Sequence, residues 1–202
     1  IIKYCVDGTV QLWNRHAEQF RSYTPPEHLG KQLLELREIL GLSNDKVSML
    51  DGGLLDQKHH AIKDTIAIWD ILVRDNEWLI GTTYQDRHTS LFPKAEQGLY
   101  IYKGKSILGT PGYHVLGHQF TTDILIPANH KAAEWDSLWG IVANINAPFT
   151  IGTPDHPNYE IKPLSEGLVF KDPNGKLSMA FSEKNNDSWM MRSRVQTGRH
   201  LF

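Results

Sequence analysis

The opening part of the chain shows two distinct patterns of apolar and polar positions. Ile1 to Trp13 contains two strand-like stretches, and Asp7-Gly8 between them is a dipeptide typical of hairpin turns. Thr24-Pro25-Pro26-Glu27 then predicts a helix start, with Thr24 as N-cap, a proline in the first position and Glu27 completing a capping box. Gly41 marks the expected helix end. Leucines at helical spacing form its apolar face: Leu29, Leu33, Leu36 and Leu40.

The middle of the chain predicts short strands and one further helix. Met49 to Leu55 and Thr65 to Val73 are apolar or β-branched and too short for long helices, so we expect two strands, the second in a core. Asp75-Asn76-Glu77 supplies a turn, and Leu99 to Tyr102 predicts another short strand. Ala132 to Ile145 predicts a helix that partly buries four apolar side chains: Trp135, Leu138, Trp139 and Val142.

The C-terminal part again predicts strands. Gly152 to Asn158 is a proline-rich loop. Gly167 to Phe170 and Leu177 to Phe181 predict a hairpin around the turn Asp172-Pro173-Asn174-Gly175, and Trp189 to Val195 predicts a last strand. Because strands dominate without a regular βαβ alternation, we expect an α+β fold with mainly antiparallel sheets flanked by helices.

Composition narrows the class of protein. With 202 residues, 40% of them hydrophobic and 22% charged, the chain resembles one ordinary globular domain, so we expect residues 1–202 to form a single domain. No apolar run approaches the roughly 18 residues that a membrane span needs. Cys5 is the single cysteine, which excludes an internal disulfide and favours a reducing, cytoplasmic location. The net charge of −2 provides no overall basic field, so any contact with nucleic acid requires a local basic patch.

Two segments near the end of the chain carry the strongest motif. Ser165-Glu166-Gly167-Leu168-Val169-Phe170-Lys171 resembles the fourth motif of the covalent nucleotidyltransferase superfamily, which includes DNA ligases, RNA ligases and mRNA capping enzymes. Trp189-Met190-Met191-Arg192-Ser193-Arg194 resembles the fifth motif of that family, an apolar strand with two alternating cations. The order and spacing of the two segments both agree with the family.

Upstream segments extend this resemblance over most of the chain. Leu50 to Leu55 is similar to the third motif, and Ile66 to Leu72 is similar to the aromatic-Asp strand that follows it. Leu79 to Arg87 resembles a ligase segment in which a short loop leads into a helix, and it favours DNA slightly over RNA as substrate. Val10 to Arg15 resembles the strand that follows the nucleotide-accepting motif.

The resemblance implies an ATP-grasp-like adenylation domain that uses ATP and Mg²⁺. Such an enzyme forms a lysyl-AMP, passes AMP to the 5′-phosphate of a nicked or broken strand and seals that end to a 3′-hydroxyl. Glu166 would then hold the metal, a role that suits a hard oxygen ligand. Lys171, Arg192 and Arg194 would neutralise phosphate, and the two arginines, two apart on a strand, would point to the same face.

Three residues would contact the nucleotide. Trp69 would pack on adenine, and Arg15 would reach the ribose or the phosphate of the incoming strand. Asp51 or Asp56 would partly replace the glutamate that the family has at the position of Gly53, because glycine offers no carboxylate. We expect a monomer that acts on nucleic acid and has no contact with a membrane.

The chain departs from the family in two places. The KxDG motif that carries the nucleophilic lysine is missing, since three residues rather than one separate Lys3 from Asp7-Gly8. We therefore expect an N-terminally truncated domain without an OB-fold domain. The missing motif and Gly53 also leave open a degenerate fold that binds nucleotide or nucleic acid without turnover. An mRNA guanylyltransferase, which shares the motifs and prefers GTP, is a further alternative.

Two other patterns favour no function. His114 and His118 are four apart, as in helical zinc sites, but Gly112 and Gly117 and the absence of a glutamate after the first histidine argue against a metal-binding helix. The Gly-Lys-Ser of residues 104–106 lacks the glycine spacing of a phosphate-binding loop.

Overall fold

The structure is a computed structural model of the chain. It describes residues 1–14, 16–20, 23–55, 63–92, 99–105, 111–127, 129–147, 150–151, 160–161, 165–179 and 187–195. Within these ranges the fold is mixed α and β, with a large, mainly antiparallel sheet and three α-helices. This agrees with the expected α+β class at the level of helices and sheets.

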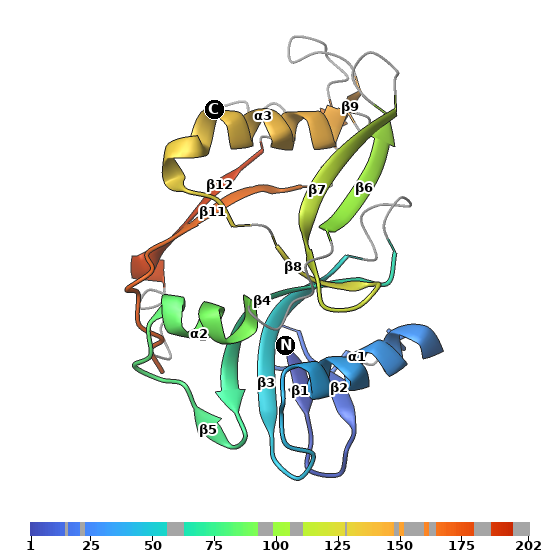
Figure 1. Ribbon diagram of the computed structural model, residues 1–202, viewed down its shortest axis with the longest axis vertical. Helices are drawn as coiled ribbons and strands as arrows, with labels where there is room; N and C mark the ends of the chain where they lie inside the picture. Colours follow the sequence, from blue (N-terminus) through green and yellow to red (C-terminus); the bar gives the residue numbers. More distant parts are fainter. Residues whose placement is uncertain are drawn as a thin grey trace.

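The large sheet has eight strands (Figure 1). Seven run in the order β2-β1-β3-β4-β8-β7-β6, and β5 pairs with the end of β4. The pairing of β4 with β8 is parallel, and the other pairings in this sheet are antiparallel. The strands are β1 (Ile2–Tyr4), β2 (Val10–Leu12), β3 (Ser48–Leu55), β4 (Thr65–Arg74), β5 (Glu77–Trp78), β6 (Leu99–Lys105), β7 (Pro111–Gln119) and β8 (Ile124–Pro127).

The main core lies between this sheet and α1 (Glu27–Ile39). Leu29, Leu33 and Leu36 of α1 are buried against apolar residues of β1, β3, β4 and β8, because helical spacing gathers them on one stripe. The Tyr4 hydroxyl donates to the Leu33 carbonyl at 2.8 Å, which satisfies a buried polar group within this core.

A second layer contains the C-terminal hairpin and α3 (Trp135–Asn146). The hairpin pairs β11 (Gly167–Lys171) with β12 (Met190–Arg194), and α3 lies across it (Figure 1). The rings of Trp135 and Phe170 are 5.4 Å apart, so the α3 side of the hairpin is covered by aromatic packing. Strands β9 (Thr150–Ile151) and β10 (Glu160–Ile161) form a separate two-stranded pair.

Most of the expected elements are present. The Ile1 to Trp13 hairpin forms β1 and β2 around Asp7-Gly8, and the Ala132 to Ile145 helix forms a 3-10 turn (Ala132–Glu134) followed by α3. The strand expected from Trp189 is β12, which begins one residue later, after a 3-10 turn (Asp187–Trp189). The proline-rich loop of residues 152–158 lies outside the described residues.

Two expectations about local structure are wrong. The N-cap is Pro26 rather than Thr24, because a residue that precedes proline disfavours helical backbone and Pro25 precedes Pro26. The hairpin expected between Gly167–Phe170 and Leu177–Phe181 does not form: Leu177 to Met179 are not in a strand, and β11 pairs with β12 instead. The remainder of that expected strand, residues 180–181, lies outside the described residues.

None of the described helices combines the length and the apolar character that crossing a bilayer requires.

Candidate functional site

The site begins at an irregularity between β3 and β4. Asp51 pairs with Asp70 and Gly52 pairs with Ile68, so the register shifts and Trp69 has no opposite residue on β3. Trp69 is 42% exposed, whereas its neighbours in β4 on both sides are buried. The bulge therefore turns one large aromatic ring outward from an otherwise buried strand.

The ring of Trp69 lies over the backbone of Gly53. A Cβ added to Gly53 would be 2.8 Å from two ring carbons of Trp69, a distance that no ordinary contact allows. The absence of a side chain at position 53 thus makes room for the indole. This pairing accounts for glycine at position 53, where the motif that the segment resembles has glutamate.

A buried ion pair joins β4 to α2 (Tyr84–Leu91). Arg87 is 1% exposed and forms a bidentate pair with Asp70, with Nε to Oδ1 at 2.8 Å and Nη2 to Oδ2 at 2.9 Å. Its Nη1 donates to the Thr82 carbonyl oxygen at 2.6 Å. Since each nitrogen has an acceptor, Arg87 fixes the position of α2 against the strand that carries Trp69.

The loop after β11 docks along the start of α2. The backbone of Leu177 exchanges hydrogen bonds with Gly81 and Thr82, and the first amides of α2 donate to the carbonyl oxygens of Gly175 and Pro173. These loop carbonyls satisfy helix N–H groups that have no partner within the helix. The α2 helix thus lies between the large sheet and the β11–β12 hairpin (Figure 1).

Lys171 at the end of β11 reaches back to the large sheet. Its Nζ is 3.5 Å from the Trp69 carbonyl oxygen, 102 positions away in the chain, and 4.1 Å from the ring centroid of Tyr84. The Tyr84 ring also stacks on Trp189, with centroids 5.8 Å apart, and the Arg87 guanidinium lies over the same Trp189 ring, 5.6 Å from its centroid. A cation on an aromatic face is stabilised electrostatically, so these contacts hold Lys171 beside Trp69.

Burial and neighbouring charges tune the ionisable groups. Burial lowers the pKa of Lys171, and the carboxylates of Asp70 and Asp51 partly oppose this shift. Burial raises the pKa of Asp51, and Asp70 raises it further while Lys171 lowers it. Burial, followed by the charge of Lys171, lowers the pKa of His88 on α2, so His88 is neutral at pH 7. Lys171, Asp51 and Asp70 therefore act on one another within one site.

The hairpin carries two more cations on the same face as Lys171. Cross-strand partners project to one side of a sheet, and Arg192 pairs with Val169 while Arg194 pairs with Gly167. Both arginines are exposed. Gly167 has φ +138° and lies so close to β12 that a Cβ would be 1.9 Å from the Ser193 carbonyl oxygen, so this pairing requires glycine. The expected phosphate-binding trio thus forms one cationic strip.

The acidic residue expected to bind metal is at the other end of this strip. Glu166 is exposed and precedes β11, and its carbonyl oxygen accepts from the Val195 amide at 2.9 Å. Lys171 is five positions further along the chain, which corresponds to roughly 16 Å of extended strand. Among the residues that the structure describes, no three histidine, cysteine, aspartate or glutamate side chains converge as metal ligands.

Two other residues considered from the sequence lie apart from this site or outside the description. Arg15 is outside the described residues, so its expected contact with ribose or phosphate stays a prediction. Lys3 is on β1, and its Nζ lies 5.7 Å from the ring centroid of Trp13. Asp7 and Gly8 form a turn, in which the Asp7 carboxylate accepts from Thr9, as the hairpin interpretation of this dipeptide predicts.

Comparisons with known proteins add no relative. No family model, curated protein or solved structure matches this chain. The functional interpretation therefore depends on the geometry of the site and on the motifs.

Sequence reasoning missed several residues that build the site. Arg87 is the last residue of one recognised segment and Asp70 lies within another, and no feature of either segment alone indicates that they form an ion pair. Tyr84, His88 and Trp189 surround Lys171 or its neighbours, but a single aromatic or histidine in a polar helix indicates no role by itself. Trp189 also packs against Gly175, where a Cβ would be 2.4 Å from the tryptophan Cβ.

Proposed function

We propose that this chain is the nucleotidyltransferase core of an ATP-dependent polynucleotide ligase. One observation carries the proposal: Lys171 of the fourth motif lies 3.5 Å from the carbonyl oxygen of Trp69 in the aromatic-Asp strand. Segments recognised separately in the sequence thus meet at one site, together with Asp51 of the third motif. A chance resemblance of short motifs would not require them to converge in space.

The residues divide into a base-binding part and a phosphate-binding part. The outward ring of Trp69 offers a flat apolar face for adenine, because bases stack on exposed aromatic side chains. Lys171, Arg192 and Arg194 form the strip that would bind the phosphates, where charge-assisted hydrogen bonds are strongest. Asp51 is half-buried and interacts electrostatically with Lys171, so it is an acidic group within this site.

The carboxylates fit a metal ion that arrives with ATP. Mg²⁺ is usually bound through one or two protein carboxylates together with substrate phosphates, so the exposed carboxylate of Glu166 beside the arginine strip suits this role. When bound, Mg²⁺ would neutralise phosphate charge. The chain's own arginines would orient the 5′-phosphate for attack by the 3′-hydroxyl, with AMP as the leaving group in the sealing step.

Nucleotide binding gives the first test. We expect Lys171→Ala to weaken ATP binding by about 10- to 100-fold, because a charged hydrogen bond contributes about 1.5–3 kcal/mol. Trp69→Ala should weaken it by at least about fivefold through loss of stacking. Lys46→Ala and Trp78→Ala are matched controls, since Lys46 is exposed and Trp78 is 53% exposed on a different strand. Calorimetry measures ATP affinity, and losses of affinity as large in the two controls as in the two site variants would contradict the proposal.

Catalysis gives the second test. The chain should seal a nicked strand that already carries AMP on its 5′-phosphate, because that step does not use the nucleophilic lysine. This chain and a form extended upstream are each incubated with Mg²⁺ and either α-labelled ATP or α-labelled GTP, and a denaturing gel then shows whether a covalent lysyl-nucleotide has formed. Label from ATP in the extended form supports the ligase, and label from GTP alone supports a guanylyltransferase. No label and no sealing in either form refute catalysis.

A second candidate function has its own supporting observation. The Trp69 ring occupies the space above Gly53, where a glutamate side chain would otherwise extend. An indole ring in place of a carboxylate favours a domain that binds nucleotide without turnover. Tight ATP binding that depends on Trp69, combined with absence of both label and sealing, would support this candidate over the ligase.

A further inference from the structure

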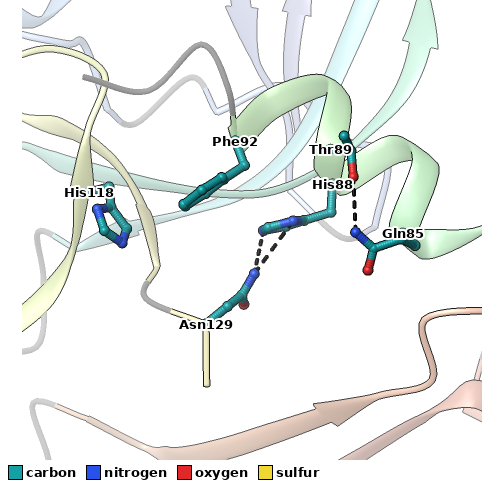
Figure 2. A pocket seen from close by; sticks show the side chains of 6 residues that line it. All are labelled: Gln85, His88, Thr89, Phe92, His118 and Asn129. Carbon is teal, nitrogen blue, oxygen red and sulfur yellow. Dashed lines mark hydrogen bonds between the residues drawn. The ribbon is translucent and has the colours of Figure 1, made fainter. Parts of the chain in front are cut away.

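A cavity of about 270 Å³ lies beside α2, on the side that faces β7 and β8 (Figure 2). None of the residues assigned to the proposed ATP and phosphate contacts lines it. Its lining comes from three segments: Gln85, His88, Thr89 and Phe92 at α2, His118 on β7, and Asn129 after β8. The volume is below the range of about 300–1,000 Å³ that is typical for whole drug-sized ligands, so the cavity suits one small ring system.

The lining has the chemistry of a pocket for a flat, uncharged, polar molecule. Among the residues that the structure describes, no lysine, arginine, aspartate or glutamate contributes to it. Burial, together with the charge of Lys171, lowers the pKa of His88, which keeps that ring neutral at pH 7. A lining without fixed charge gives little attraction for a phosphate or a metal ion.

Aromatic rings form one wall of the cavity. Phe92 lies between two imidazoles: its centroid is 5.6 Å from that of His88, with planes 21° apart, and 5.2 Å from that of His118, in an edge-on arrangement. Phe92 is 42% exposed, so part of its ring is accessible. An accessible aromatic ring is a surface on which a planar heterocycle can stack.

Two carboxamides, one on α2 and one after β8, also line the cavity. The Asn129 amide lies 2.5 Å from the His88 imidazole, and Gln85 Nε2 donates to the Thr89 hydroxyl at 2.9 Å (Figure 2). Each carboxamide has two N–H donors and a carbonyl acceptor, so these bonds leave further capacity on both groups. Paired donors and acceptors beside an aromatic wall are the combination that recognises the polar edge of a base.

We propose that this cavity binds a nucleobase, separate from the one expected on Trp69. The inference rests on the proposed function, because it takes nucleotides or polynucleotides as the ligands of this chain. The base comes either from a free nucleotide or from an unpaired position of a single strand. The two sources share the same ring chemistry, and the experiment below distinguishes them.

The test measures binding of adenosine, and separately of a short single-stranded DNA, without ATP or Mg²⁺. Phe92→Ala should weaken binding of at least one of these ligands by about fivefold or more, since stacking contributes that much. Asn129→Ala should also weaken it, and because Asn129 is an exposed residue after β8, this variant keeps the test valid if Phe92→Ala fails to fold. Phe20→Ala is the control, because Phe20 has a similar exposure of 39% and follows the opposite edge strand, β2.

The outcomes separate the sources and the two proposals. Loss of adenosine binding identifies a free nucleotide, and loss of DNA binding alone identifies an unpaired base of the strand. The inference is overturned if Phe92→Ala and Asn129→Ala bind adenosine and the DNA with the same affinity as the unmodified chain and Phe20→Ala. It is also overturned if the unmodified chain binds neither ligand. Pocket-dependent base binding in a chain that neither binds ATP nor seals strands would support this inference while the proposed function fails.

Discussion

Replacement of Arg87 by methionine should destabilise the fold strongly. Arg87 and Asp70 are 1% and 4% exposed, and two hydrogen bonds of 2.8 and 2.9 Å join them. In Arg87→Met the Asp70 carboxylate loses its cation, and the Thr82 carbonyl oxygen loses a donor at 2.6 Å. Breaking a buried ion pair from one side costs about 3–5 kcal/mol, because a buried charge remains without compensation.

A double variant distinguishes the cost of leaving one charge unpaired from the loss of the ion pair as a whole. In Asp70→Leu combined with Arg87→Met neither member of the pair leaves a charge behind, so we expect it to recover more than half of the loss. Lys31→Met is the control, since Lys31 pairs with Glu27 at 2.7 Å on the exposed surface of α1. An exposed helical pair of this kind contributes about 0.3–0.5 kcal/mol.

Urea unfolding, followed by tryptophan fluorescence and circular dichroism, measures these free energies. The two signals should coincide, which validates a two-state analysis. A loss below about 1 kcal/mol in Arg87→Met, comparable to a surface pair, would refute the assignment of a buried, structural ion pair. A double variant that is less stable than Arg87→Met would refute the argument that the unpaired carboxylate causes the loss.

Three further predictions concern the site. Burial lowers the pKa of Lys171, so ATP affinity should decline as the pH rises through that lowered pKa, at a lower pH than for an ordinary lysine. Lys171→Arg should keep its ATP affinity from neutral to alkaline pH, and calorimetry checks both expectations. Burial raises the pKa of Asp51, so its charge destabilises the native state above that pKa. Asp51→Asn should therefore raise the unfolding free energy at neutral pH, and the difference should disappear in acid. Gly175→Ala should lower stability by about 1–3 kcal/mol, since its Cβ would overlap Trp189, and thermal melting checks this.

Local patterns predicted the elements that depend on local sequence. The α1 helix follows from the spacing of its leucines, and the first hairpin follows from Asp7-Gly8. The β7 and β8 strands were missed because Pro111–Gln119 contains two glycines without a clean alternation, and Ile124–Pro127 has four residues. Only long-range pairing, which a single sequence does not display, defines them as strands.

In the candidate site, too, local sequence predicted some features, while others depend on long-range contacts. Arg192 and Arg194 share a face, as their spacing on a strand predicts. The contact of Lys171 with Trp69 and the ion pair of Asp70 with Arg87 depend on the bulge in β4 and on the docked loop after β11. Residues 172–175 were expected to form the turn of a hairpin with a strand at Leu177–Phe181, but the chain after them docks on α2, where the Pro173 and Gly175 carbonyl oxygens accept from its first amides.

The separation of Lys171 from Trp69 by 102 positions also affects how the protein is made. A nascent chain that has left the ribosome only as far as α3 already contains β3, β4 and α2. It does not yet contain Lys171 and Trp189, which complete the site. Contacts between such distant positions form in about milliseconds to seconds, rather than the microseconds typical of local helices. During synthesis, Trp69 and the start of α2 therefore have no contact with Lys171 and the loop after β11 until β11 and β12 emerge.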